Sequence, residues 1–177
     1  TYNGTDTNVS YEFGLNFTPD FVWIKPRSFA DNHALSDSTR GVNKSLASNT
    51  SSAEQTTLGV ASFDTGGFTL PNWGNVNDSG EEFVAWCFKA NGGTTSSNTD
   101  GSVTSTVQAN QDSGFSIVTA TAPSSGVFTV GHGLNAEIDL YIIKNRSSSG
   151  GWITYVRDLG ANKYLELNGT DAAGTST

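Results

Sequence analysis

An internal repeat constrains this chain more than any other feature of its sequence. Residues 13–53 align without a gap onto residues 132–172, at an offset of 119 positions. The two segments are identical at 14 of the 41 aligned positions. The residues that recur are Gly14, Leu15, Asn16, Asp20, Ile24, Lys25, Arg27, Ser28, Gly41, Asn43, Lys44, Leu46, Asn49 and Ala53. Agreement in one register over this length predicts that a single structural unit occurs twice.

The pattern of apolar residues predicts short β-strands. The matching segments 21–27 and 139–146 are apolar on both faces and then turn basic, as in a central strand that leaves a core. Clusters of Gly, Asn, Asp and Ser between the candidate strands indicate turns, and residues 31–40 leave room for one helical turn. The other candidate strands are residues 44–49, 59–64, 67–70, 83–88, 102–109, 115–121, 152–157 and 163–167. We therefore expect an all-β fold of tandem antiparallel β-sandwich units, of the jelly-roll or concanavalin-like kind.

The repeat also predicts how the chain is divided. Residues 1–92 form the first expected sandwich repeat, residues 93–114 a linker or bridging segment, and residues 115–177 the second repeat. The second repeat ends before any counterpart of residues 83–88, and the chain opens at Thr1 without Met. Because an unfinished sandwich leaves an unpaired strand edge, we expect the second repeat to be completed by chain beyond Thr177 or by another subunit.

Charge and cysteine content disfavour several classes of protein. A formal net charge of −8 and a pI near 4.5 predict an acidic surface, which repels nucleic acid and anionic membranes. Cys87 is the only cysteine, so no internal disulfide can form. No apolar run is long enough to span a bilayer, and we expect no membrane insertion. The negative charge favours solubility at high copy number.

Several motifs together are similar to one known family. They are Phe-Thr-Pro-Asp-Phe-Val-Trp-Ile-Lys at 17–25 followed by Arg27-Ser28, Ser-Phe-Asp at 62–64, Gly-Phe-Thr-Leu at 67–70, Phe-Val-Ala-Trp-Cys-Phe at 83–88, the stretch from 98 to 118, Gly-His-Gly-Leu at 131–134, and Ile-Lys-Asn-Arg-Ser at 143–147. This combination covers nearly the whole chain. It resembles a repeated domain of uncharacterised function in fibre-like virion proteins of marine tailed phages, including cyanophages. In that family such repeats often lie beside laminin-G or concanavalin-like domains.

The resemblance implies a structural protein of the bacteriophage virion surface, on a tail fibre or a capsid-surface fibre or decoration, that attaches to surfaces multivalently. It implies an extracellular location, other virion proteins as partners, and a homo-oligomer, for which a trimer is the family-level expectation. The family has no established catalytic residues, so we expect no enzyme activity and no cofactor. One alternative is a carbohydrate-binding, lectin-like module of a secreted or viral protein, with host surface glycan as its ligand. A depolymerase that uses a carboxylate pair is a third hypothesis.

Six of the nine basic residues occupy repeated positions. They are Lys25, Arg27, Lys44, Lys144, Arg146 and Lys163. Such a pattern in an acidic chain suits an anion site, for example for sulfated or carboxylated glycans. The alternative is structural: these residues form ion pairs with Asp20, Asp37, Asp139 or Asp158 and fix strand ends. Recurrence in two units that need not share a ligand favours the structural interpretation.

Two of the four tryptophans are candidates for glycan contact. Trp73 lies in a turn-rich segment and Trp152 follows two glycines, so we expect both rings to be exposed. Exposed aromatic rings can stack on the faces of sugars. The alternative for both is an edge tryptophan that closes a sandwich. Trp23 and Trp86 lie in strongly apolar strands and are expected in the core.

Metal and catalytic chemistry have little support in the sequence. Residues 75–82 offer several oxygen ligands for a calcium ion but lack the spacing of an EF-hand, and solvated turn residues are the alternative. His33 and His132 do not occupy equivalent repeat positions. Cys87 lies in an apolar strand and is expected to be an inert thiol. We therefore predict no catalytic residues and no metal site.

Overall fold

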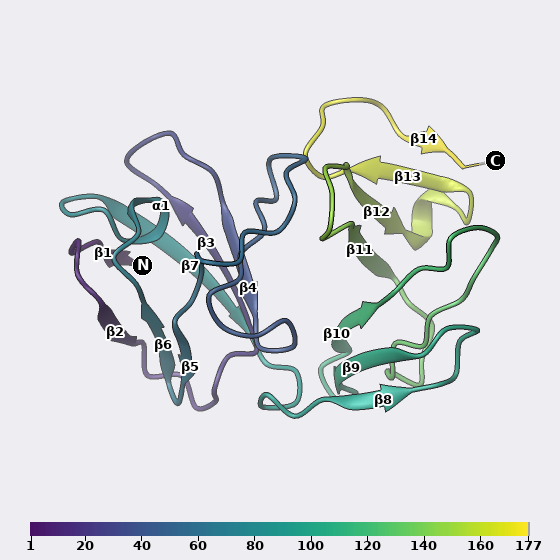
Figure 1. Cartoon of the computed structure of the whole chain (residues 1–177), viewed down its shortest axis with the longest axis horizontal. Helices are drawn as coiled ribbons and strands as arrows, with labels where there is room; N and C mark the ends of the chain where they lie inside the picture. The colour runs from purple at the N-terminus through teal and green to yellow at the C-terminus, as the bar shows by residue number, and fades with distance from the viewer. Residues whose placement is uncertain (177) are drawn as a thin grey trace.

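The computed structural model describes residues 1–176; Thr177, the last residue of the expected second repeat, lies outside the described residues. The chain is all-β, as expected, with short strands arranged in several antiparallel sheets. Strands β1–β7 gather on one side of the molecule and strands β8–β14 on the other (Figure 1). We call residues 1–92 the N-terminal half and residues 93–176 the C-terminal half.

The N-terminal half contains two antiparallel sheets, with strand orders β1-β7-β3-β4 and β2-β6-β5. Its elements are β1 (Tyr2–Asn3), β2 (Val9–Glu12), β3 (Phe21–Pro26), β4 (Ala34–Asp37), β5 (Ser62–Asp64), β6 (Gly67–Leu70), the short helix α1 (Gly74–Asn77) and β7 (Glu82–Phe88). Side chains alternate along β3, so Val22 and Ile24 are buried while their neighbours on the other face are partly exposed. One face of the larger sheet therefore packs against a hydrophobic core.

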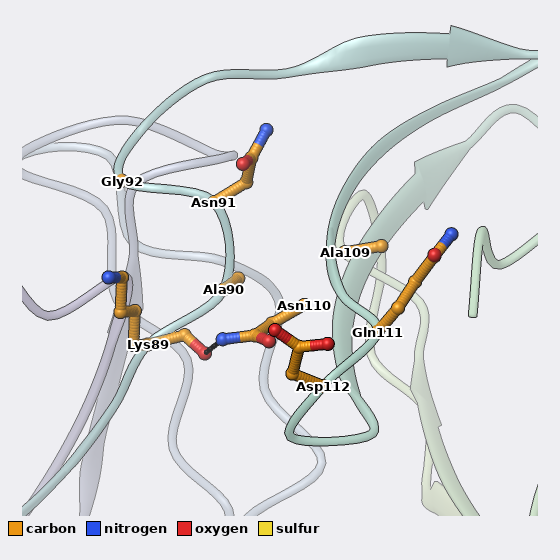
Figure 2. Close-up of a pocket in the computed structure, with 8 residues that line it drawn as sticks. All are labelled: Lys89, Ala90, Asn91, Gly92, Ala109, Asn110, Gln111 and Asp112. Atoms are coloured by element: carbon orange, nitrogen blue, oxygen red, sulfur yellow. Dashed lines mark hydrogen bonds between the residues drawn. The ribbon is translucent and has the colours of Figure 1, made fainter.

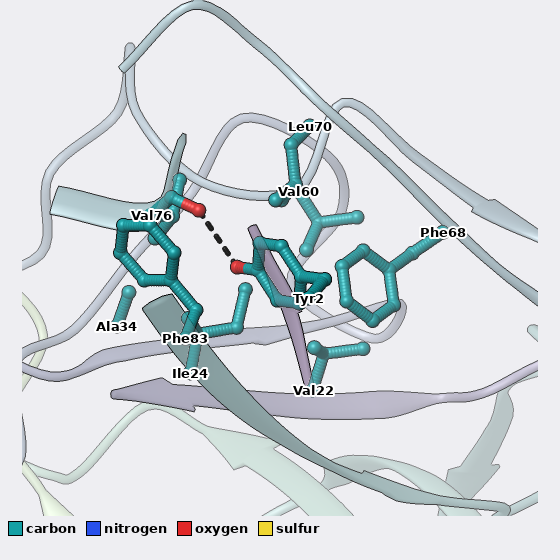
Figure 3. Packing of buried hydrophobic residues seen from close by; sticks show 9 residues of the cluster. All are labelled: Tyr2, Val22, Ile24, Ala34, Val60, Phe68, Leu70, Val76 and Phe83. Carbon is teal, nitrogen blue, oxygen red and sulfur yellow. Dashed lines mark hydrogen bonds between the residues drawn. The ribbon is translucent and has the colours of Figure 1, made fainter. Parts of the chain in front are cut away.

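That core lies between the two sheets and is dominated by aromatic rings. Tyr2 stacks on Phe83 with ring centroids 5.2 Å apart and meets Phe68 edge-on at 6.3 Å. The Tyr2 hydroxyl donates a hydrogen bond of 2.7 Å to the carbonyl of Val76, as Figure 3 shows. This bond satisfies the one polar group of a buried ring, so a sequence with few hydrophobic residues still builds a dry core from large side chains.

The C-terminal half contains sheets with strand orders β10-β9-β8 and β11-β12-β13-β14. Its elements are β8 (Ser96–Asn98), β9 (Ser105–Asn110), β10 (Phe115–Ala120), β11 (Leu140–Lys144), β12 (Trp152–Val156), the 3₁₀ turn η1 (Arg157–Leu159), β13 (Lys163–Glu166) and β14 (Gly174–Thr175). Strands β8 and β9 fall within residues 93–114, the segment expected as a linker. That segment therefore contributes two ordered strands to the β10-β9-β8 sheet.

Strand pairing follows the same pattern in the two repeated segments. At the offset of 119, opposed residues 21/37, 24/34, 35/46 and 45/55 correspond to opposed residues 140/156, 143/153, 154/165 and 164/174. Gly41 and Gly160 also share a φ of +95°, a conformation that favours glycine. The halves differ beside this hairpin, because β3 lies between β4 and β7 whereas β11 is the edge strand of its sheet.

Two further observations concern helices. The helical turn considered for residues 31–40 is wrong, because this segment forms strand β4, whose four residues are all buried. Its backbone pairs with β3 along the whole strand, and a helix there would remove those hydrogen bonds. No helix in residues 1–176 has the length and apolar character needed to cross a membrane.

Candidate functional site

The outward face of the β1-β7-β3-β4 sheet carries a group of aromatic side chains. Phe21 lies opposite Phe88, and Trp23 lies opposite Trp86, across the β3–β7 ladder. Their rings meet edge-on, at 5.8 Å for the first pair and 5.9 Å for the second. These residues point away from the core because they alternate with the residues that line it. We call these four residues together with Phe115 of β10 the aromatic face.

Trp152 covers one end of this region, and the burial of Trp152 and of Trp86 differs from what the sequence led us to expect. It is only 5% exposed and packs with Leu35, Leu46, Phe21 and Trp23, whereas Trp86 is 47% exposed. The Trp152 indole N–H donates to the carbonyl oxygens of Ala47 and Thr50, at 3.0 and 3.1 Å. The expectation of an exposed ring at Trp152 is therefore wrong, and so is the expectation of a core position for Trp86. Trp152 is therefore buried against the N-terminal half, whereas Trp86 stays open to solvent.

An open, mostly polar pocket of about 550 Å³ lies at the end of the aromatic face. Residues 89–92, which follow β7, form one wall, and residues 109–112, at the β9–β10 turn, form the other. In Figure 2 the side chains of Asn110 and Asp112 lie between these walls, and Gln111 points away from them. Amide, carboxylate and ammonium groups line this pocket, so it can exchange hydrogen bonds with a polar ligand.

Two buried polar side chains hold the first wall of the pocket in place. Asp20 accepts backbone N–H groups from Ala90, Gly92 and Gly93, at 2.7, 2.8 and 2.6 Å. The amide of Gln108 accepts a further hydrogen bond of 3.0 Å from the Gly93 N–H. Because Asp20 belongs to the N-terminal half and Gln108 to β9, the turn between them is fixed by both halves of the molecule.

The aromatic face and the pocket adjoin each other. Phe88 directly precedes Lys89, and its ring stacks on Phe115 with centroids 5.3 Å apart. Phe115 lies directly opposite Asn110 in the β9–β10 ladder, so their side chains share one face of that hairpin. The Asn110 amide donates to the Lys89 carbonyl at 3.5 Å, a long contact across the pocket (Figure 2). An apolar platform and polar groups therefore lie side by side.

A neutral histidine borders the aromatic face beside Trp23. The Trp23 indole N–H donates a 3.0 Å hydrogen bond to Nδ1 of His33, so this nitrogen carries no proton. Burial lowers the pKa of His33, and the positive charge of Lys25 lowers it further. The ring therefore stays neutral at physiological pH and holds the indole in place.

The comparisons with known proteins identify a family. A family model described as "Domain of unknown function (DUF7483)" matches residues 1–177. The chain belongs to this family. No curated protein and no solved structure matches the chain.

Four of the six repeated basic residues hold backbone or glutamate oxygens, and Lys163 binds the Thr175 hydroxyl at 2.6 Å. No ion pair in residues 1–176 joins the repeated basic residues to the aspartates expected from the sequence. Lys25 and Lys144 each donate a 2.7 Å hydrogen bond to the carbonyl of the following residue. Arg27 pairs with Glu82 on the surface, and Arg146 pairs with Glu54 across the two halves. The expected partners Asp37 and Asp139 bind Arg40 and Arg157 instead. The ion pairs expected between the repeated basic residues and these aspartates are therefore wrong within residues 1–176, because Asp37 and Asp139 bind other arginines.

Trp73 and Asn77 have packing roles. Trp73 is partly buried against the N-terminal core, directly before α1. The Asn77 side chain, in the segment considered for calcium, accepts the Thr5 N–H at 3.0 Å and donates to the Thr7 carbonyl at 2.6 Å. Within residues 1–176, no cluster of three or more His, Cys, Asp or Glu is arranged to hold a metal ion.

Sequence reasoning missed the aromatic face and the pocket for a specific reason. Residues 83–88 are apolar at every position, so alternation does not reveal which of their faces meets solvent. The pocket joins residues about 20 positions apart in the sequence, and neither wall has a motif of its own. The first wall contains Asn-Gly-Gly at 91–93, a sequence that is typical of a turn and does not by itself indicate a pocket.

Proposed function

We propose that this chain is a structural and attachment module of a bacteriophage virion surface, on a tail fibre or a capsid-surface fibre, and that the aromatic face with its adjoining pocket contacts host surface glycan. The observation that carries the glycan contact is the exposure of Trp86 beside the stacked pair Phe88 and Phe115 at the edge of a polar pocket. The virion location is supported by the resemblance of the β3 and β7 sequences to fibre repeats.

The glycan chemistry of this proposal favours neutral sugars. Exposed aromatic rings offer apolar faces to the C–H groups of a pyranose, and nearby amides exchange hydrogen bonds with its hydroxyls. Asn91, Asn110 and Asp112 supply such groups in the pocket. The formal net charge of −8 repels sulfated or carboxylated glycans, so the anionic ligand considered from the repeated basic residues is disfavoured.

The duplicated strand pairing supports tandem β-sandwich units, of the jelly-roll or concanavalin-like kind, as the architecture of this module. The hairpins β3–β4 and β11–β12 pair in the same register, and the pairing that follows each hairpin corresponds as well. A duplicated unit is a simple way to build a long surface protein from one sequence pattern.

Contacts between the halves support a role in display. Arg146 and Trp152 of the C-terminal half bind Glu54, Ala47 and Thr50 of the N-terminal half through side-chain hydrogen bonds. Such contacts hold neighbouring units at a set distance. Copies presented together then combine weak contacts into tight attachment, with a gain of about 100- to 10,000-fold over one copy.

Glycan binding is tested with the monomeric chain and with a streptavidin-linked tetramer on an array of neutral and acidic bacterial polysaccharides. We expect the monomer to bind neutral glycans weakly and the tetramer to bind them at least about 100-fold more tightly. The double variant Trp86→Ala/Phe88→Ser should abolish both signals. Val42→Ala, which alters another exposed apolar side chain, is the matched control and should retain them. Unchanged binding by the double variant would contradict the proposed site.

The virion location is tested separately. Antibodies raised against the folded chain are applied to intact particles of a phage that encodes it, and bound antibody is located by gold labelling in electron micrographs. We expect gold on fibres of intact particles. Labelling confined to disrupted particles or host debris would contradict the location and leave the glycan test unaffected.

A further inference from the structure

Strand β11 lacks the neighbour that its counterpart has. In the N-terminal half, β3 lies between β4 and β7, and Phe21 opposes Phe88 in the β3–β7 ladder. In the C-terminal half, β11 pairs with β12 in the register of β3 with β4, but β11 is the last strand of its sheet. The side of β11 that corresponds to the β7 side of β3 therefore has no strand against it within residues 1–176.

The backbone of β11 is arranged to accept such a strand. The Arg157 N–H donates to the Asp139 carbonyl at 2.9 Å, so odd-numbered residues of this segment bond to β12. Because hydrogen-bonding direction alternates along an antiparallel strand, the N–H and C=O groups of Leu140 and Ile142 point toward the free edge. An edge that presents these groups in a row is a template for pairing with another strand.

The side chains of β11 are also uncovered, and on both faces of the sheet. Leu140 is 56% exposed and Ile143 is 57% exposed, and these two lie on opposite faces. Their counterparts Phe21 and Ile24 are shielded by β7 and by the layers packed on that sheet. A run of exposed aliphatic and aromatic residues beside an open edge is typical of a surface that receives a partner.

We propose that the free edge of β11 binds an extended peptide strand with the chemistry of β7, added antiparallel in the register that β7 adopts on β3. The occupant is a separate polypeptide segment of about seven residues, apolar and aromatic on both faces, with an acidic N-terminal end. In this register Leu140, Ile142 and Lys144 oppose the positions of Phe88, Trp86 and Val84. Binding adds backbone hydrogen bonds at the edge and covers the apolar side chains.

Groups at both ends of β11 fit this occupant. In the N-terminal half, Asp20 is fully buried and accepts three backbone N–H groups from the turn that follows β7. Its repeat counterpart Asp139, at the matching end of β11, has a side chain that is 82% exposed. At the other end, the ammonium of Lys144 bonds to backbone carbonyls of residues 145 and 148. In the proposed register the acidic start of a β7-like strand lies opposite Arg146, the repeat counterpart of Arg27, which pairs with Glu82. The guanidinium of Arg146 binds Glu54 and is 37% exposed.

The test uses a synthetic peptide with the sequence of residues 81–89, Ser in place of Cys87, and a fluorescein label. Its binding to the whole chain is measured by fluorescence anisotropy. We expect saturable binding at micromolar concentrations that Ile142→Pro weakens at least about tenfold. Proline at 142 removes an outward N–H and leaves the β12 ladder intact, which edge strands tolerate. The thermal unfolding of Ile142→Pro, followed through buried Trp152, shows whether it remains folded.

N-methylated peptides give a control that does not depend on folding of a variant. In β7, the even-numbered residues bond to β3, as the 2.7 Å bond from the Arg27 N–H to the Glu82 carbonyl shows. A peptide N-methylated at positions 84 and 86 should therefore bind about tenfold more weakly or not at all. A peptide N-methylated at 83 and 85 should bind as the parent does. Equal binding of the two methylated peptides would overturn the proposal.

The register is tested by disulfide trapping. Val22 lies opposite Cys87 in the β3–β7 ladder, so the chain variant Tyr141→Cys/Cys87→Ser should form a disulfide with a peptide that carries Cys at position 87 when oxidised glutathione is supplied as the oxidant. A peptide with Cys at position 85 and Ser at 87 should react much more slowly. The chain could instead bind no peptide and form a dimer that Ile142→Pro dissociates. That result would show that β11 pairs with β11 of a second copy, and it would overturn the proposal.

Discussion

Glu54 receives two hydrogen bonds from the guanidinium of Arg146, at 3.0 and 2.8 Å, although the residues are 92 positions apart. A third bond of 2.9 Å comes from buried Arg40. Glu54→Gln removes the negative charge between these two guanidinium groups and leaves one of them buried with a single carboxylate partner, Asp37. We expect a loss of about 3 kcal/mol in the free energy of unfolding, measured by urea denaturation.

The matched control for this prediction is Glu82→Gln. Glu82 pairs with Arg27 at the same distance of 2.9 Å, but both side chains are about half exposed. Removal of a surface ion pair should change the free energy of unfolding by about 0.5 kcal/mol. If the two substitutions cost the same, burial does not set the strength of the Glu54 contact.

The Glu54 network should also make stability depend on pH. Burial alone raises the pKa of Glu54, but hydrogen bonds from Arg146 and Arg40 outweigh it and hold this pKa below its usual 4.5. A lowered folded-state pKa means that the stabilisation is complete above pH 4.5 and is lost as the pH falls through the folded value. The stability difference between the wild-type chain and Glu54→Gln should therefore shrink between pH 5 and pH 3 in urea titrations. A difference that stays constant over this range would contradict the ionic origin of the contact.

Asp20 and Asp139 occupy equivalent repeat positions and should respond differently to the same substitution. Asp20 is fully buried and accepts three backbone N–H groups and the Ser38 hydroxyl. Asp20→Asn replaces one acceptor oxygen by a donor inside this set, and we expect a loss of about 3 kcal/mol. Asp139→Asn affects only a surface pair with Arg157 and should cost about 0.5 kcal/mol. Thermal unfolding of both variants checks this, and equal losses would contradict it.

Alanine substitutions of Trp152 and Trp86 should affect the free energy of unfolding and glycan binding in opposite order. Trp152→Ala leaves a cavity between the halves and removes an indole that binds two carbonyls, so we expect a loss of about 4 kcal/mol. Trp86→Ala truncates a half-exposed ring and should cost about 1 kcal/mol. In glycan binding we expect the reverse order, with a large loss for Trp86→Ala in a chain that remains folded. Urea denaturation and the polysaccharide array measure the two effects on the same samples.

Several strands were predictable from local patterns in the sequence. Residues 21–27 and 139–146 correspond to β3 (Phe21–Pro26) and β11 (Leu140–Lys144), and residues 67–70 match β6 (Gly67–Leu70) at both ends. Apolar runs bounded by turn residues indicate strands in either half because this signal is local. Strands β1, β2, β4, β8 and β14 were missed because they are short or polar, and β1 and β2 in addition pair with the distant strands β7 and β6.

The candidate site was not predictable, because it depends on which surfaces meet. Trp152 follows two glycines and was expected to be open, yet it is buried because a loop of the other half folds over it. Trp86 lies in an apolar strand and was expected in the core, yet the sheet has a second face that the C-terminal half covers only in part. Arg146 pairs with Glu54, which lies in a loop whose sequence has no recognisable pattern. Contacts between halves leave no periodic signal in the sequence.

Cys87 provides a last prediction, about reactivity. Burial raises the pKa of its thiol to about 11, and its side chain packs against the N-terminal core. At pH 8 only about one thiol in a thousand is then ionised, so reaction with Ellman's reagent should be slow in the folded chain and fast in urea. Between pH 7 and pH 10 the folded-state rate should rise about tenfold per pH unit without a plateau. An unlabelled peptide of residues 81–89 that retains Cys87 serves as control and should reach its plateau near pH 9. A plateau near pH 9 in the folded chain would mean that the thiol is solvated and that β7 opens at its Cys87 end.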